Sequence, residues 1–311
     1  MQPERAWLEW VRRAAARGVA RPEVRVGIGD DAAILRPRRG WELAITTDLF
    51  VEGVHFLRRR DAAASCGWRL AARAVSDLAA MGAEPLALFV SSAYPAALDP
   101  AWPRQLYRGL MAAAAAAGCG VAGGDVSAAA GDAILLDVVG AGQVPSGQAL
   151  RRSGARPGDR LFVSGVLGEA ARGRALAHAG LVPRTAADRR ALARHRRPRA
   201  RWELGLALRG RASAAMDVSD GLATDLHRLC AASRVGAELL ADRVPALARP
   251  DGLALALAGG EDYELLFTLP PRRRPPPGTH EIGRILAVPG VCLVRGGRRE
   301  PLAPAGWEHF A

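Results

Sequence analysis

The stretch at residues 212–233, ASAAMDVSDGLATDLHRLCAAS, carries the pattern on which the fold prediction rests. Residues 212–218 are mostly small or apolar and predict a strand, whereas residues 219–233 show the apolar spacing of a helix. Asp217, Asp220 and Gly221 lie at the junction, and glycine there permits a tight turn. The stretch therefore predicts an α/β fold with carboxylates where a strand passes into a helix.

The same alternation of strand and helix extends along the chain. Apolar, β-branched runs predict strands at residues 24–28, 41–47, 86–92, 133–144, 161–164 and 263–269. Helical spacing predicts helices at residues 5–17, 61–81, 102–117 and 167–179. A region rich in glycine and proline at residues 144–159 separates two halves, and we expect two domains, 1–148 and 149–311. Both halves are expected to be α/β (α+β), with mixed sheets and helices.

The charge pattern excludes some phosphate-binding schemes. The chain has 311 residues with a formal net charge of +12, and all 43 basic residues are arginine. A P-loop and a protein-kinase fold both need a lysine, so neither can operate here in its usual form. The basic runs lack interleaved aromatic residues, so we read the arginine excess as a chain-wide bias and expect no nucleic-acid partner. An arginine-rich nucleic-acid-binding protein is the rival reading from another functional class.

The cysteines and the N-terminus indicate a cellular compartment. Cys66, Cys119, Cys230 and Cys292 are isolated, without a CxxC pair or a nearby histidine at zinc-ligand spacing. The N-terminal stretch is amphipathic rather than a basic tip with an apolar run, and no apolar tract is long enough for a membrane span. We therefore expect a cytoplasmic protein that does not associate with a membrane.

Five acidic motifs follow apolar stretches and carry the chemical prediction. They are GIGDD at Gly27, TTD at Thr46, Asp77 on the predicted long helix, GGD at Gly123 and DVSDG at Asp217. Each motif alone is better explained by an Asx turn, a hairpin turn or a helix cap. If they converge at one edge of the fold, their mutual repulsion requires a cation, and an all-oxygen ligand set suits Mg²⁺. Magnesium takes further ligands from substrate phosphates, so the motifs favour a nucleotide and phosphoryl transfer.

Eight ordered motifs make the sequence similar to the thiamine-monophosphate kinase family, within the superfamily of aminoimidazole ribonucleotide synthetase. They are GIGDDAAIL at Gly27, TTDLFVEGVHF at Thr46, AVSDLAAMGAEP at Ala74, AGGDVS at Ala122, LRRSGARPGD at Leu150, MDVSDGLATDL at Met216, GGEDYELLF at Gly259 and GWEHF at Gly306. Together they span nearly the whole chain. The resemblance implies a two-domain fold like that of aminoimidazole ribonucleotide synthetase, an N-terminal ATP- and magnesium-binding domain, and a C-terminal domain that completes the site.

The resemblance also implies an activity and a set of site residues. ATP would phosphorylate thiamine monophosphate to thiamine diphosphate by direct in-line transfer, with several Mg²⁺ ions and a homodimer. The implied metal ligands are Asp31, Thr46, Thr47, Asp48, Asp77, Asp125, Asp217 and Asp220, of which Asp48, Asp77, Asp125 and Asp220 would carry catalysis. The implied ATP contacts are Tyr107, Gly124, Asp125, Arg152 and Ser219, and those to the thiamine end are His55, Glu261 and Trp307. The acceptor oxygen is already ionised, so no covalent nucleophile or catalytic base is expected.

Simpler explanations stand beside several of these assignments. Tyr107 is equally compatible with a packed core position, a histidine in the setting of His55 is more often packed than a ligand contact, and Ser219 is compatible with a helix cap. Asp30 is left out of the ligand set because it is expected only to shape its turn, and Trp307 lies near a terminus, where fraying is common. The nearest rival enzyme is another ATP-dependent member of the same superfamily with a different acceptor.

Overall fold

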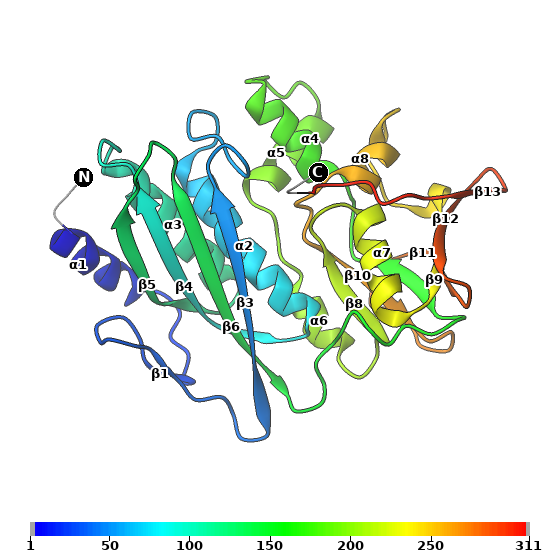
Figure 1. Cartoon of the computed structure of the whole chain (residues 1–311), viewed down its shortest axis with the longest axis horizontal. Helices are drawn as coiled ribbons and strands as arrows, with labels where there is room; N and C mark the ends of the chain where they lie inside the picture. Colours follow the sequence, from blue (N-terminus) through cyan, green and yellow to red (C-terminus); the bar gives the residue numbers. More distant parts are fainter. Residues whose placement is uncertain (1–3, 309–311) are drawn as a thin grey trace. The chain divides into compact units, whose positions relative to one another are not determined.

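The computed structural model describes residues 4–308. Backbone contacts divide the chain into two compact units. The N-terminal unit comprises the described residues up to Leu78 together with Ala83–Ser146, and the C-terminal unit comprises Ala79–Gly82 together with residues 147–308. Each unit contains a sheet and helices (Figure 1), which confirms the predicted α/β class.

The sheet of the N-terminal unit has four strands within the described residues. In spatial order they are β3 (Trp41–Val51), β6 (Leu135–Pro145), β4 (Glu84–Tyr94) and β5 (Gly120–Ala128). The β4–β5 pair is parallel and the other two pairs are antiparallel. Two short strands, β1 (Val24–Val26) and β2 (Ile34–Leu35), form a separate antiparallel pair. This mixed arrangement places β3 and β5 at opposite edges of the sheet.

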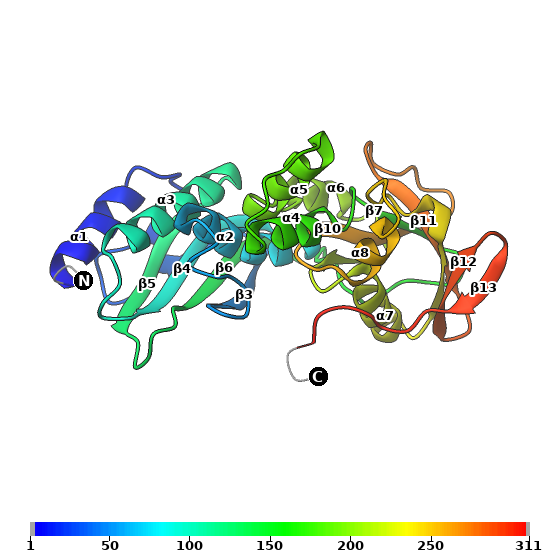
Figure 2. The same ribbon diagram turned by 90° about the horizontal axis from the view of Figure 1, so that it is seen from above.

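Helices cover one face of this sheet. They are α1 (Glu4–Ala15), α2 (Ala63–Ala80) and α3 (Ala101–Ala116), and Figure 2 shows α2 and α3 along the same side of the strands. Two glycines let α2 and α3 touch: a Cβ atom on Gly67 would lie 1.8 Å from the Leu106 carbonyl oxygen, and one on Gly109 would lie 1.8 Å from that of Ala64. The α2–α3 distance is therefore set by positions that have no side chain.

The other face of the sheet has no helix within this unit. Successive side chains of a strand point to opposite faces, so in β3 Phe50 is fully buried under the helices whereas Ile45 and Leu49 are 68% and 63% exposed. Leu43 and Leu135 are also exposed. Large apolar side chains thus gather on the uncovered face.

The sheet of the C-terminal unit has seven strands within the described residues. In spatial order they are β13 (Arg298–Pro301), β12 (Gly290–Arg295), β9 (Gly236–Leu240), β11 (His280–Leu286), β7 (Arg160–Val163), β10 (Glu264–Leu269) and β8 (Ala214–Val218). Only β9 and β12 run parallel among these neighbours. The helical elements are α4 (Glu169–His178), α5 (Ala186–Arg196), α6 (Trp202–Leu208), α7 (Leu222–Ser233), α8 (Gly252–Ala258) and the 3₁₀ turn η1 (Ala241–Arg243).

The apolar alternation of β8 explains how this sheet is covered. Met216 and Val218 belong to one core with Leu226 of α7, whereas Ala215 belongs to a second core with Leu208 of α6. Period-2 alternation thus supplies apolar side chains to both faces. Figure 1 shows α7 across one of these faces.

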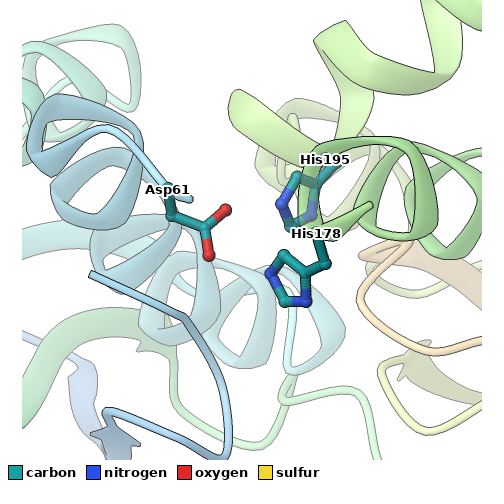
Figure 3. A group of neighbouring side chains, drawn as sticks. All are labelled: Asp61, His178 and His195. Atoms are coloured by element: carbon teal, nitrogen blue, oxygen red, sulfur yellow. The ribbon is translucent and has the colours of Figure 1, made fainter. Parts of the chain in front are cut away.

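The helices α4 and α5 pack directly against each other. A Cβ atom on Gly173 would lie 2.0 Å from the Ala191 carbonyl oxygen, so the two backbones touch there. His178 meets His195 edge to face, with ring centroids 5.9 Å apart (Figure 3). Among the described residues, no helix is both long and apolar enough to cross a membrane.

Candidate functional site

Carboxylates and hydroxyl groups of β3 and α2 form one polar group on the covered side of the N-terminal sheet. Thr46 and Asp48 alternate with Thr47 along β3 and therefore face α2. The Thr46 hydroxyl donates a hydrogen bond to Asp77 Oδ2, and Arg73 Nε lies 3.5 Å from Asp48 Oδ1. The prediction that the acidic motifs lie where strands end is wrong here, because β3 continues to Val51 and Asp48 lies within it.

One oxygen atom of the Asp48 carboxylate, Oδ2, is buried without a hydrogen-bond partner in the described chain. Burial raises the pKa of Asp48 to about 6; attraction by Arg73 opposes this shift, and repulsion from Asp77 and Asp137 adds to it. An orphaned carboxylate oxygen beside a second carboxylate and hydroxyl groups fits a hard divalent cation such as Mg²⁺.

Asp137 is a member of this neighbourhood that the sequence motifs did not reveal. It lies on β6, and its Oδ1 accepts a hydrogen bond of 2.8 Å from the Thr47 hydroxyl on the uncovered side of the sheet. The signal available in the sequence was a lone acid inside the apolar run LLDVV.

Asp125 lies apart from Asp48 within the N-terminal unit. Both β3 and β5 are edge strands, with two strands between them, which corresponds to about 14 Å at the usual strand spacing. Asp125 is exposed on the uncovered side, in register with Ser91 and Asp137. The predicted convergence of the acidic motifs therefore does not extend to Asp125 within this unit.

The GGD motif lies inside β5 rather than in a turn. Gly124 has φ +150°, and a Cβ atom there would lie 2.1 Å from the Val90 carbonyl oxygen. The motif thus lets β5 approach β4 closely. Tyr107 on α3 is 4% exposed and meets Trp7 edge to face at 5.2 Å, and burial raises the pKa of Tyr107 to about 12.

His55 and the GIGDD motif lie in loops of the N-terminal unit. His55 is half-buried, stacks on Phe50, and accepts a hydrogen bond of 3.0 Å at Nδ1 from the Val51 backbone N–H. In a neutral imidazole this contact assigns the ring hydrogen to Nε2. Asp31 is exposed, and its backbone N–H donates to the Asp30 carboxylate at 2.9 Å, so Asp30 shapes the turn.

A buried carboxylate organises the DVSDG turn of the C-terminal unit. Asp225 Oδ2 accepts hydrogen bonds from the backbone N–H groups of Ser219, Asp220 and Gly221 at 3.0, 3.0 and 3.2 Å. Burial raises the pKa of Asp225 to about 6, against these backbone hydrogen bonds. Arg228 forms ion pairs with both Asp220 and Asp225. Asp225 is therefore a structural residue, and its position within a predicted helix did not indicate this role.

Two of the three predicted acceptor residues, Glu261 and Trp307, lie against this turn. The Glu261 backbone N–H donates to the Ser219 carbonyl at 2.8 Å, and the Trp307 backbone N–H donates to that of Asp220 at 3.2 Å. The Trp307 side chain is 44% exposed. Within the C-terminal unit, the fold thus assembles four predicted site residues from three distant segments. The last two residues of the GWEHF motif lie outside the described residues.

The loop that carries Glu261 has unusual backbone geometry. Glu261 and Tyr263 have φ values of +67° and +52°, which are uncommon for residues with a side chain and concentrate at functional sites. Between them, Asp262 is 7% exposed and accepts hydrogen bonds from the backbone N–H groups of Gly168 at 2.7 Å and Ala170 at 3.2 Å. Asp262 thus ties the loop to the start of α4. Burial raises the pKa of Asp262 to about 7.

The other two predicted site residues of this unit, Asp217 and Arg152, do not share the surroundings of Ser219 and Asp220. Asp217 is 4% exposed, and strand alternation turns it away from α7. Arg152 is exposed, and its carbonyl accepts a hydrogen bond of 2.9 Å from the Ser233 hydroxyl at the end of α7. The 12 residues of α7 separate this point from the DVSDG turn by about 18 Å of helix, so the backbone of Arg152 does not lie beside Ser219.

Comparisons with known proteins agree with this architecture. The family described as AIR synthase related protein, N-terminal domain, matches residues 29–144, and the corresponding C-terminal domain matches residues 156–290. A thiamine-monophosphate kinase of Salmonella typhimurium is 38% identical, with 94% of each chain covered. The crystal structure of a thiamine-monophosphate kinase from Stenotrophomonas maltophilia is 37% identical with a TM-score of 0.81, and covers 96% of this chain and 98% of its own.

A further solved structure is that of a complex with ligands. It is AaThiL complexed with AMPPCP and TMP, which is 32% identical with a TM-score of 0.81 and covers 99% of this chain and 97% of its own. The matches extend over both units, and they confirm the predicted two-domain fold of mixed sheets and helices.

Proposed function

The chain belongs to the thiamine-monophosphate kinase family, and from this premise we propose that it transfers the γ-phosphoryl group of ATP to the phosphate of thiamine monophosphate. The products are thiamine diphosphate and ADP. The observation from this structure that best supports the proposal is Asp48, whose buried Oδ2 lacks a partner in the described chain while Asp77 lies nearby. That arrangement suits a cation-dependent reaction of phosphates.

The residues proposed to hold magnesium form two groups in the N-terminal unit and one in the C-terminal unit. Asp48, Asp77 and Thr46 form the first, Asp125 the second, and Asp220 with Asp217 the third, while Asp31 and Thr47 supply further oxygen atoms. When bound, Mg²⁺ would neutralise phosphate charge and so allow two anions to approach each other. The separation of Asp48 from Asp125 within one unit supports several ions rather than a single one.

The chain itself supplies binding and orientation. The acceptor phosphate is ionised at neutral pH, so no side chain needs to remove its proton. Arg152 offers a planar guanidinium that can bind two phosphate oxygens, and Gly124, Tyr107 and Ser219 are the other proposed contacts to ATP. Alignment of donor and acceptor is then the main contribution of the protein to the rate.

The thiamine end is proposed to bind at Trp307, Glu261 and His55. The exposed ring of Trp307 provides a face for a cationic aromatic group, and Glu261 lies on a loop with constrained backbone beside Ser219. The Nε2–H group of His55 offers a hydrogen-bond donor. These three residues are therefore the part of the site that selects the acceptor.

The proposal includes a homodimer in the cytoplasm. Its support is the uncovered face of the N-terminal sheet, where Ile45, Leu49, Leu43 and Leu135 are exposed. Contiguous apolar side chains on a surface mark an interaction site. Sedimentation equilibrium tests this part: a single species of monomer mass at micromolar concentration contradicts it.

The activity is tested by incubating the purified protein with ATP, Mg²⁺ and thiamine monophosphate and measuring thiamine diphosphate. We expect product from the parent and from Asp242→Asn, a control at an exposed carboxylate, but none from Asp48→Asn. If the parent binds ATP yet forms no thiamine diphosphate, the acceptor is different and the chain is another ATP-dependent enzyme of the superfamily.

A further inference from the structure

A cavity of about 1270 Å³ lies within the C-terminal unit next to the start of α4, and its lining contains no residue of the DVSDG turn or of the Glu261 loop. Its walls are α4, α5 with the segment before it, and the segment at residues 246–249. We call it the arginine groove, since its lining includes Arg172, Arg189, Arg190, Arg194, Arg196, Arg197 and Arg249. The proposed function uses none of these residues.

The groove has a strong excess of positive charge. Against its seven arginines, the lining contains only two carboxylates, Glu169 and Asp188. Like charges that face the same cavity repel each other, and the repulsion is stronger there than across open water. A multivalent anion in the groove would remove this repulsion.

Glu169 and Asp188 hold three arginine side chains of the lining in position, and Asp251, just outside the lining, pairs with a fourth, Arg249. Arg172 Nη2 lies 2.9 Å from Asp188 Oδ1. Arg190 Nε lies 3.4 Å from Glu169 Oε1, and Arg194 Nε lies 3.5 Å from Glu169 Oε2. Arg172 and Arg194 are only 24% and 34% exposed, so their guanidinium groups are fixed in the walls. Fixed arginines lose little conformational freedom on binding a phosphate.

Arg189 differs from these residues. It lines the groove and is exposed, and within the described chain it makes no side-chain hydrogen bond or ion pair. Its guanidinium keeps its donors available for a ligand.

The groove also has an apolar part. Val166, Leu192, Ala246 and Leu247 contribute to the lining, and small-molecule sites combine such surface with a few polar groups. We propose that the arginine groove is a second ligand site that binds a small organic molecule carrying two or more phosphate charges. It does not depend on the magnesium ligands of the proposed active site.

The test is a calorimetric titration with inorganic tripolyphosphate in the presence of EDTA. Chelation removes the cation on which phosphate binding at the Asp48 group depends, so the binding that remains is that of arginine side chains, in the groove or at Arg152. The groove variant is Arg189→Gln, Arg190→Gln and Arg249→Gln together. The matched control is Arg272→Gln, Arg273→Gln and Arg274→Gln, which removes the same charge from an exposed loop of the same unit.

We expect the parent to bind tripolyphosphate and the groove variant to bind at least tenfold more weakly. The loop control and Arg152→Gln should remain within twofold of the parent, and the groove variant should keep the parent's kinase activity. The single variant Arg189→Glu, at a side chain without a partner in the described chain, should also weaken binding and serves if the triple variant does not fold.

Three outcomes overturn the inference. Equal losses in the groove variant and the loop control mean a general charge effect. A loss confined to Arg152→Gln assigns the anion to the ATP site. Binding of a single-stranded oligonucleotide but not of tripolyphosphate means that the surface binds a polynucleotide instead of a small molecule.

Discussion

Asp262 offers a quantitative test of the electrostatics around the candidate site. Its carboxylate is 7% exposed, and burial raises its pKa from an ordinary value of 3.8 to about 7 although two backbone N–H groups donate to it. Because the folded protein binds this proton more tightly than the unfolded chain, stability is highest below about pH 4 and declines until pH passes about 7. Between pH 5 and pH 8 the expected loss from this group is about 2.5 kcal/mol.

The perturbation is Asp262→Asn, which keeps the shape and one acceptor but removes the titration. Urea unfolding of both proteins at pH 5, 6, 7 and 8 gives the free energy of unfolding at each pH. We expect the parent to lose about 2.5 kcal/mol relative to the variant across this range. The free energy of unfolding of the variant, relative to that of the parent, should be highest at pH 8.

Asp251→Asn is the matched control. Asp251 is half-exposed, and the neighbouring Arg249 lowers its pKa, so its contribution to stability is present above pH 4 and is lost only in more acidic solution. The difference in free energy of unfolding between the parent and Asp251→Asn should therefore not change from pH 5 to pH 8. If the difference between the parent and Asp262→Asn is also independent of pH, the Asp262 carboxylate does not have the raised pKa expected from its burial, and the reasoning fails.

Three further predictions concern activity and packing. Asp48→Asn should abolish turnover, while its thermal midpoint in EDTA should equal or exceed that of the parent, because the cost of burying the Asp48 charge, together with repulsion from Asp77 and Asp137, outweighs its attraction to Arg73; retained turnover contradicts the assignment. EDTA should abolish formation of thiamine diphosphate by the parent, and added Mg²⁺ should restore this activity. Turnover without metal would contradict the mechanism. Gly109→Ala should lower the free energy of unfolding by about 3 kcal/mol in urea titrations, because its Cβ atom would lie 1.8 Å from the Ala64 carbonyl oxygen; an unchanged midpoint would contradict the α2–α3 contact.

The sequence predicted elements well where local periodicity is strong. The expected helix at residues 102–117 corresponds to α3 (Ala101–Ala116), and the expected strand at residues 133–144 corresponds to β6 (Leu135–Pro145). Both stretches combine a clear apolar period with bounding turn residues. The strands β9, β11 and β12 are not evident from the sequence, because their apolar runs are short and those of β9 and β11 contain polar residues.

The candidate site was predicted less completely, because its geometry depends on long-range pairing. The motif around Asp125 looked like a turn, yet it lies within β5, where two glycines serve a close approach to β4. Asp137 approaches Thr47 only because β3 pairs with β6 across 90 residues of sequence. Strand order and register are not encoded in any single motif, so sequence spacing alone could not distinguish Asp48 and Asp77, which lie together, from Asp125, which lies at the other edge.

The three hydrogen bonds to Asp225 have a consequence for how this protein can recognise phosphate. The first backbone N–H groups of a helix commonly bind phosphate directly. Here the backbone N–H groups of the three residues just before α7, Ser219, Asp220 and Gly221, donate to the Asp225 carboxylate of that helix. These three N–H groups are thus not available to a phosphate, and the turn presents the oxygen atoms of Asp220 instead. A phosphate that approaches this end of α7 meets negative charge, and only a cation can join the two.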